Sequence, residues 1–130
     1  MAEITADGYT RLRTNEVGTW FVELRDDSNQ PVPLDDGAEG SVNRVAVADD
    51  RVTVTDNTDT QTITFAVALT ATDVTPESVT LPVTVEGVVA YAAVSGGNPL
   101  TQVETFTPFT FADPADELTV RLHVEVPEQA

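Results

Sequence analysis

The sequence lacks cysteine and lysine, and it contains one histidine and four serines. Without cysteine the chain has no disulfide, no thiolate nucleophile and no thiolate metal site. The single histidine, His123, lies between Arg121 and Glu125 on the polar side of an alternating run, which indicates a solvent-facing or interface position. No serine lies in a nucleophile elbow, and no phosphate-binding or dinucleotide fingerprint is present. We therefore expect a protein that is not an enzyme, with no catalytic residue and no cofactor.

Long apolar runs are also missing. No stretch approaches the roughly 18 apolar residues of a membrane-spanning helix. The opening segment, MAEITADGYTRLR, is too polar for a secretory signal. No basic stripe offsets the negative charge of the chain, so nucleic acid should be repelled. These features predict neither a membrane nor a nucleic acid as a partner.

Acidic residues are the abundant functional groups. Twenty-two aspartates and glutamates stand against six arginines and give a net charge of −16 at pH 7, while 41% of the residues are apolar. An apolar share of this size is enough for a folded core, and the charge exceeds what solubility requires. Molar salt would screen the self-repulsion, since the Debye length falls to about 3 Å at 1 M. The composition favours a halophile; the alternative is an ordinary acidic protein of a mesophile.

Paired aspartates stand beside predicted loops at 26–27, 35–36 and 49–50. Carboxylate oxygens gathered in loops are the ligands that calcium prefers. None of these pairs has the spaced ligand pattern of a calcium loop, and an acidic surface supplies such pairs in any case. The sequence therefore predicts no metal site, and it leaves open whether a carboxylate cluster binds a cation.

Valine and threonine, twenty of each, favour β-strands. Alternation is clearest where Ile63, Phe65, Val67 and Leu69 point inward between small or polar residues. Eight runs of this kind are predicted as strands, with a ninth possible: 17–25, 42–48, 51–55, 60–71, 79–86, 88–94, 105–111 and 118–126. Short strands at this spacing predict one antiparallel β-sandwich or jelly roll over residues 1–130, with a short helical arm at 1–15.

Three local features refine this prediction. The segment 56–59, Asp-Asn-Thr-Asp, has the composition of a tight turn. Pro82 cannot donate to a strand ladder, so the strand 79–86 should be an edge or be bulged at that residue. The strand 88–94 is nearly all apolar and should be buried on both faces, and 95–99 should form the loop after it.

The aromatic residues are few and grouped. Trp20 and Phe21 are neighbours on opposite faces of one strand, so one of them should face away from the main core. Phe106, Phe109 and Phe111 crowd around Pro108. Core packing explains such a group, and the alternative is an apolar contact patch for another subunit. The candidate interface therefore consists of Phe106, Phe109, Phe111 and Trp20.

The second half of the chain follows a distinct order of strands and turns. An apolar strand with an acidic residue leads to a Gly-Gly turn, a leucine, an F-x-P-F-like segment, an acidic turn and a final strand that ends in proline. These features are Glu86-Gly87, Ser95-Gly96-Gly97, Leu100, 106–109, 113–117 and 118–127. This order resembles that of the small structural proteins of tailed viruses, and the likeness spans most of the chain. The segments WFVELRDDSNQPV and ITADGYTRLR are similar to the early strand and the leading helix of such chains.

The resemblance implies a virion part that assembles in the host cytoplasm, and the acidic composition suggests a virus of haloarchaea. Its expected role is capsid decoration through self-association and docking on the major capsid or tail proteins; a tail or baseplate component is the alternative. A separate possibility is a carbohydrate- or protein-binding β-sandwich of a halophile. A sugar site would use exposed aromatic platforms, for which Trp20, Tyr9 and Tyr91 are the candidates.

Overall fold

The computed structural model describes residues 5, 8, 15–35, 43–57, 59–76 and 79–125. In these ranges the chain forms seven strands in two antiparallel sheets and one 3₁₀ helix. The strands are β1 (Phe21–Arg25), β2 (Arg44–Ala46), β3 (Val52–Asn57), β4 (Thr62–Thr70), β5 (Val83–Tyr91), β6 (Glu104–Phe111) and β7 (Glu117–Glu125), with the helix η1 (Ala71–Val74) after β4. The prediction of a β-rich chain is confirmed. The helical arm expected at 1–15 lies almost wholly outside the described residues, and a helical turn at 15–17 precedes β1.

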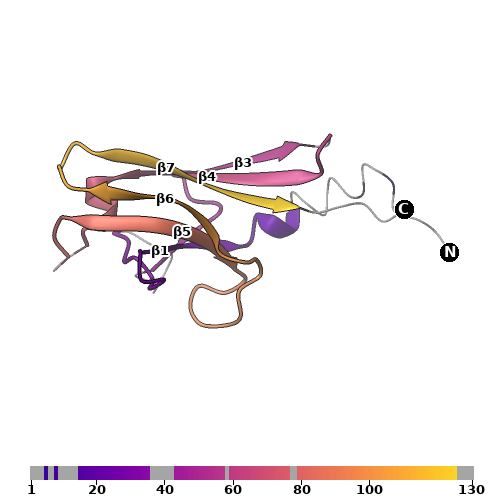
Figure 1. Ribbon diagram of the computed structural model, residues 1–130. Helices are drawn as coiled ribbons and strands as arrows, with labels where there is room; N and C mark the ends of the chain where they lie inside the picture. The colour runs from indigo at the N-terminus through magenta and orange to yellow at the C-terminus, as the bar shows by residue number, and fades with distance from the viewer. Residues whose placement is uncertain are drawn as a thin grey trace.

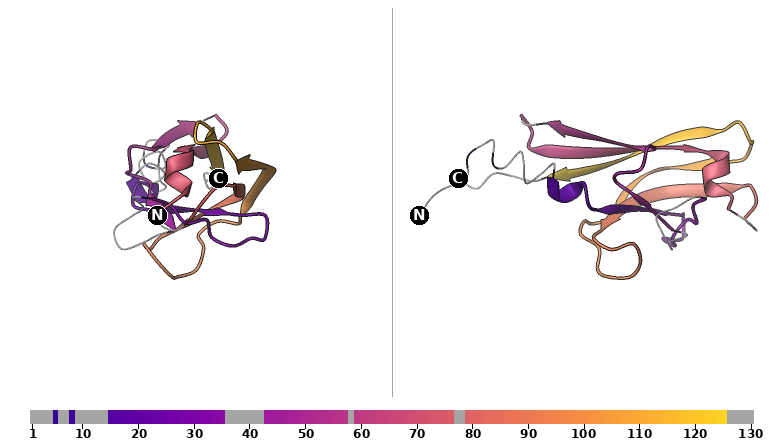
Figure 2. Two further views of the ribbon diagram at one scale, coloured as in Figure 1. Left: turned by 90° about the vertical axis from the view of Figure 1, so that its left-hand side faces the viewer. Right: turned by 180° about the vertical axis from the view of Figure 1, so that it is seen from behind.

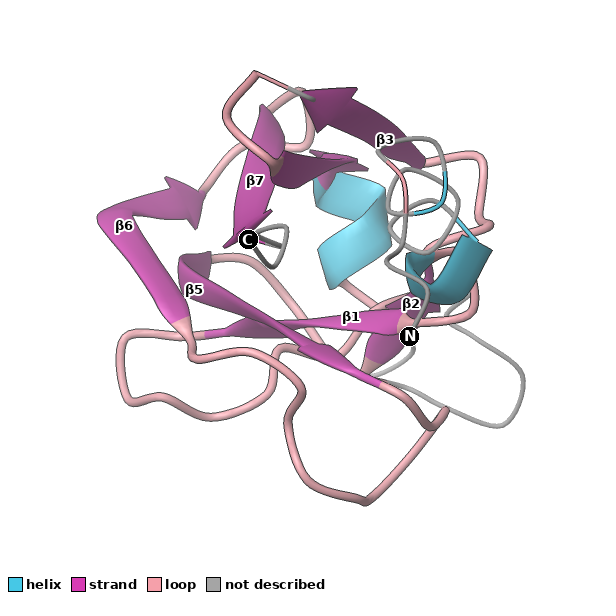
Figure 3. Cartoon of the chain, turned by 90° about the vertical axis from the view of Figure 1, so that its right-hand side faces the viewer, coloured by secondary structure: helices cyan, strands magenta, loops and turns pink. Residues whose placement is uncertain are grey.

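The two sheets lie as two layers with the core between them (Figures 1 and 3). Sheet A has the strand order β2-β1-β5-β6, and sheet B has the order β3-β4-β7. The end views place β6 beside β7 on one side of the molecule and β2 on the side of β3 (Figures 2 and 3). Each sheet therefore has two outer strands, and these four strands determine which backbone edges are open.

The core follows the predicted alternation. On β4, Ile63, Phe65, Val67 and Leu69 are buried, while the residues between them are exposed or partly exposed. The inner face of β7 continues these rows through antiparallel pairs, of which Phe65 with Leu122 is the central one. Burying a side chain of this size contributes about 1.5–3 kcal/mol. The regular alternation explains why the register of sheet B is well defined, since a slip by one residue would expose the whole apolar set.

Two of the predicted strands are one strand. Residues expected in 79–86 and 88–94 form the single strand β5, and the irregularity lies between Val85 and Gly87 rather than at Pro82, which precedes the strand. A bulge adds a residue without ending the strand, so the two alternation patterns read as separate elements. Gly87 is required there, because a Cβ on it would lie 2.9 Å from Cγ1 of Val103. The buried stretch ends at Tyr91 instead of continuing to residue 94.

The turn predicted at 56–59 comes later in the chain. Strand β3 continues through Asn57, whose side-chain oxygen accepts hydrogen bonds from the backbone N–H groups of Asp59 (3.0 Å) and Thr60 (3.2 Å). Gln61 then takes the left-handed conformation, with φ of 55°. Asparagine closes such turns with its own side chain, so the composition indicated the turn correctly and misplaced its start.

Candidate interaction surface

The aromatic residues predicted as an interface lie at different depths. Phe111 is fully buried in the core, so it is not accessible to a partner. Phe109 is partly buried and packs edge-to-face on Phe111, with ring centroids 5.0 Å apart, and Phe106 is partly buried against the same core. Trp20 precedes β1 and packs edge-on against Phe65 at 6.2 Å. Phe106, Phe109 and Trp20 each keep part of the side chain at the surface, and their role as an interface stays a prediction.

A groove runs between β6 and β7, the outer strands of the two sheets. It consists of two hollows of about 560 and 240 Å³, both lined by Glu104 and His123. The larger hollow is also lined by Leu100, one of the large apolar side chains left exposed, with 45% of its surface accessible. The smaller hollow is lined by Phe106 and Leu118. This β6–β7 groove is the candidate contact surface of the described residues.

Glu104 connects the two sheets across the groove. One carboxylate oxygen of Glu104 accepts a hydrogen bond from the backbone N–H of His123 at 2.8 Å, and the other lies 2.8 Å from Nδ1 of the same residue. The His123 side chain is half exposed, at 51%, as predicted for the polar face of the last strand. The carboxylate therefore occupies a backbone donor at the outer edge of β7. Sequence reasoning missed this contact because Glu104 precedes His123 by 19 residues and belongs to the other sheet.

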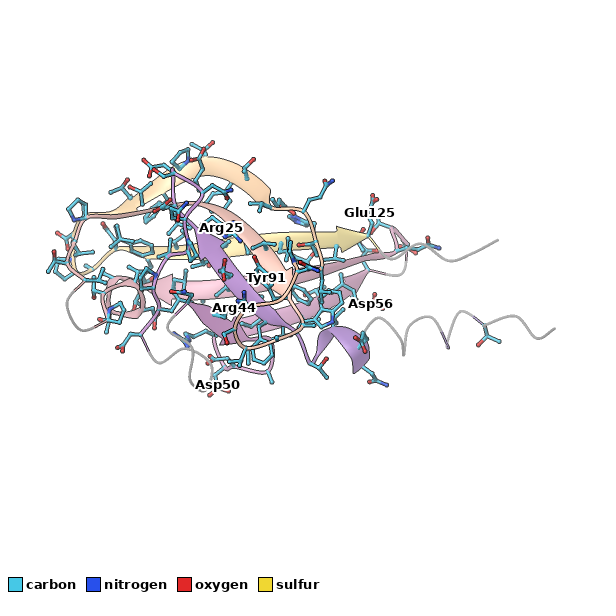
Figure 4. All side chains as sticks on the ribbon, turned by 90° about the horizontal axis from the view of Figure 1, so that it is seen from below. Arg25, Arg44, Asp50, Asp56, Tyr91 and Glu125 are labelled. Carbon is cyan, nitrogen blue, oxygen red and sulfur yellow. The ribbon has the colours of Figure 1, made fainter. Side chains whose placement is uncertain are left out.

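A buried ionic network lies on the outer face of sheet A (Figure 4). Glu23 accepts hydrogen bonds from Nε of Arg25 at 2.8 Å and from Nε of Arg44 at 2.9 Å. Arg25 also reaches the hydroxyl of Tyr91 at 2.6 Å, and the Arg44 guanidinium lies 3.6 Å above the centroid of the Tyr91 ring. Glu23 and Arg44 are nearly inaccessible to solvent. Buried charges persist when they are paired and hydrogen-bonded, as these are.

Arg44 also fixes the loop that follows β5. Its Nη1 donates to the carbonyl oxygens of Ala93 at 2.7 Å and Gly96 at 2.9 Å. The loop then turns through Gly96 and Gly97, which have positive φ, and it leads to Leu100. Leu100 itself is held by its backbone N–H, which donates to the carbonyl oxygen of Ala90 at 2.8 Å. The sequence predicted this loop but not that Arg44 holds it. The feature that could have indicated this role is an arginine at the start of the otherwise apolar run 44–47.

The pair Asp49-Asp50 stands beside an arginine that neutralises part of the cluster. Arg51 contacts Asp49 and Asp73, each at 3.0 Å, and donates to the carbonyl oxygen of Asp35 at 3.0 Å. The hydrogen bond from the Arg51 side chain lowers the pKa of Asp49, against a smaller opposing effect of burial. Across the described ranges no three acidic or histidine side chains gather as a metal site would require.

Comparisons with protein-family models, with curated proteins and with solved structures find no match for this chain. Within the part of the chain that the structure describes, no helix has the length and apolar character needed to cross a membrane.

Proposed function

We propose that this chain is a β-sandwich or jelly-roll structural protein in the virion of a tailed virus of haloarchaea. Its role there is capsid decoration. It acts without chemistry of its own, by associating with further copies and by docking on the major capsid or tail proteins. The likeness of its strand-and-turn pattern to such virion proteins motivates the proposal.

The observation that carries the proposal is the β6–β7 groove. Its walls contain the partly buried Phe106 and the exposed Leu100, and Phe109 lies on the same outer strand. Aromatic side chains that are half covered in the free protein gain burial when a partner covers them, and such residues often dominate interface energies. The groove combines this apolar surface with the fixed loop that presents Leu100, which suits docking of another protein.

The charge distribution supports a setting of high salt. Three of the six arginines, Arg25, Arg44 and Arg51, are engaged in ion pairs inside the molecule. They compensate carboxylates in partly buried positions and leave the outward acidic groups in excess. Subunits with this surface would repel one another in dilute buffer and approach readily once salt screens the charge.

The placement of the aromatic residues favours protein contact over sugar binding. A sugar platform needs an exposed ring face. Tyr91 is 7% exposed and lies beneath Arg44, and Trp20 packs against Phe65. The third candidate, Tyr9, lies outside the described residues.

A tail or baseplate position would use the same groove, so the location on the particle has to be determined directly.

The direct test is immunogold electron microscopy of virus particles from the culture that produces the chain, with antibodies raised against the purified protein. Gold over the capsid is the expected result. Gold confined to the tail would establish the alternative position. If the cells contain the protein but their virus particles carry no gold label, the proposal is overturned.

The groove has its own test in the variant Phe106→Asp, which places a charge in the wall of the smaller hollow and is measured as incorporation into particles at high salt. A carboxylate on β6 should abolish docking while the fold persists. The matched control is Thr107→Asp, which adds the same charge at an exposed position of the same strand. If a folded Phe106→Asp protein enters particles as the parent does, the groove is not the contact surface.

The high-salt setting predicts that stability rises with ionic strength. Urea unfolding at about 0.1 M and about 2 M salt compares weak with strong screening. We expect a higher urea midpoint at 2 M, because the net charge of −16 destabilises the compact state through self-repulsion. A midpoint that is unchanged or lower at 2 M would contradict the halophilic assignment.

A further inference from the structure

Three of the four outer strands carry features that hinder the addition of another strand. Strand β2 is three residues long. Strand β6 contains Pro108, which has no backbone donor, and its register to β5 is irregular. The edge of β7 is occupied by the carboxylate of Glu104 at the N–H of His123. Short edges, prolines, bulges and charged side chains are the usual means by which proteins prevent edge-to-edge pairing.

The fourth outer strand, β3, has none of these features at its centre, and its one charged residue, Asp56, lies next to its last residue. Its centre is Thr53, Val54 and Thr55, which are uncharged and exposed, and it contains no proline. Its ladder with β4 is regular over six residue pairs. Among the described residues no strand pairs with its other side. Val54 keeps 37% of its surface accessible although Phe65, its direct neighbour on β4, is fully buried.

The hydrogen-bond pattern shows which backbone groups of β3 point outward. The N–H of Ala68 on β4 donates to the carbonyl oxygen of Arg51 at 2.9 Å, just before β3 begins. Backbone groups of successive residues point to opposite sides of a strand, so Thr53 and Thr55 also face β4. The N–H and C=O of Val54 therefore point to the free side.

We propose that β3 pairs in antiparallel fashion with β3 of a second copy, with Val54 on the two-fold axis. A residue whose N–H and C=O both point outward forms two hydrogen bonds with its own counterpart across such an axis. The two copies of sheet B then join into one continuous six-stranded sheet. The exposed Val54 side chains meet at its centre and cover each other.

The strand is complementary to itself in this register, which is why a second copy is the partner. Thr53 faces Thr55 of the other copy, and Val52 faces Asp56, so no like charges stand directly opposite. Cross-strand threonine pairs stabilise sheets. The two Asp56 carboxylates lie four residues apart along the strands, about 14 Å, which exceeds the Debye length in molar salt. The pairing is thus compatible with an acidic protein in high salt.

A single cysteine at the axis tests the register, because the chain contains no other cysteine. In 2 M salt with oxidised glutathione, Val54→Cys should form a disulfide-linked dimer, since residues paired across hydrogen-bonded positions lie about 5.5 Å apart at Cα, within disulfide range. The control is Thr53→Cys, also at an exposed position of β3, whose two copies would lie more than about 7 Å apart. Faster linkage of Thr53→Cys, or none for Val54→Cys, would overturn the proposed register.

Sedimentation equilibrium in 2 M salt tests the association itself. The parent should show twice the 13.9 kDa mass of one chain. Val54→Pro removes the outward donor and keeps the ladder with β4, and it should weaken dimerisation at least about tenfold through lost hydrogen bonds. Val54→Lys disturbs the fold less and should also weaken dimerisation, so it replaces the proline variant if that variant does not fold. A monomeric parent, or a folded Val54→Lys protein that dimerises as the parent does, would overturn the proposal.

This inference adds a defined contact to the self-association in the proposed function, and the two fail separately. Phe106→Asp alters the β6–β7 groove and should leave the sedimentation mass unchanged. If the protein sediments as a dimer but the antibodies label no particles, the β3 pairing stands and the virion role fails. If the protein sediments as a monomer but the antibodies label particles, the virion role stands and the β3 pairing fails.

Discussion

Strands β3 and β7 border the same central strand, β4, and end sheet B in opposite ways. Phe65 on β4 pairs with Val54 on one side and with Leu122 on the other. Leu122 is 1% exposed and Val54 is 37% exposed, although all three residues belong to one row of the same face. Sharing a row on the inner face of the sheet therefore does not determine how deeply a residue is buried. The burial depends on which segments cover the outer strand that carries the residue.

The difference follows from how the chain enters each strand. A tight turn leads from β6 directly into β7, and the carboxylate of Asp116 accepts the backbone N–H groups of Ala112 and Asp113 in it, each at 2.9 Å. These two hydrogen bonds lower the pKa of Asp116. The turn keeps β6 beside β7 and brings Glu104 to its edge, whereas β2, on the side of β3, is only three residues long (Figure 3). One edge of sheet B is thus closed by the fold and the other is left for association.

The largest expected effect separates Leu122 from Val54. Leu122→Ala should lower the free energy of unfolding by about 2–5 kcal/mol, because it leaves a cavity beside Phe65. Val54→Ala at protein concentrations that favour the monomer should cost less, about 1 kcal/mol, because 37% of the Val54 surface is already in water. Urea unfolding of both variants measures the contrast. Equal losses would show that the β3 row is covered as fully as the β7 row.

A smaller effect concerns the protection of the β7 edge. Glu104→Ala should destabilise the protein by about 1 kcal/mol, since it removes a partly exposed, charge-assisted hydrogen bond to the His123 backbone. Glu125→Ala removes the same charge from an exposed position of β7 and should change stability by less than about 0.5 kcal/mol. Chemical denaturation of the two variants provides the comparison. Identical behaviour would mean that Glu104 does not stabilise the edge.

The smallest effect concerns the ion pair at the start of β3. Because Arg51 lowers the pKa of Asp49 in the folded state, the pair contributes stability that is present above the ordinary aspartate value of about 3.9 and is lost as pH falls through the lowered value. Asp49→Asn should therefore cost about 0.5 kcal/mol at pH 7, and its deficit should shrink below pH 4. Asp50→Asn, the exposed neighbour, serves as control. A deficit that grows toward low pH would contradict this assignment.

The sequence predicted the interior of the strands better than their connections. Alternation over β4 and β7 identified the buried rows, because a two-residue period reflects burial directly. A bulge was expected at Pro82 and lies between Val85 and Gly87 instead, and the extension of β3 through Asn57 was missed. Both features depend on register against a neighbouring strand. Phe111 was assigned to an interface and belongs to the core, because composition alone does not reveal which face of β6 the core covers.

Contacts between distant segments were beyond the sequence. The ion pair of Glu23 with Arg44 joins two paired strands, and the hydrogen bond from His123 to Glu104 joins the two sheets. Asp56 and Glu125 likewise lie at the same end of sheet B although they are 69 residues apart in the sequence (Figure 4). The strand order of the two sheets determines which strand edges stay open, and no local sequence pattern predicts that order.

Hydrogen exchange followed residue by residue by NMR in 2 M salt, over a range of protein concentrations, tests the contrast between the two edges most directly. The amide of His123 is occupied by Glu104 within one chain, so its protection should not depend on concentration. The amide of Val54 should exchange rapidly in dilute protein and become protected as concentration rises, because only a second copy covers it. Protection of Val54 that is the same at every concentration would contradict the account.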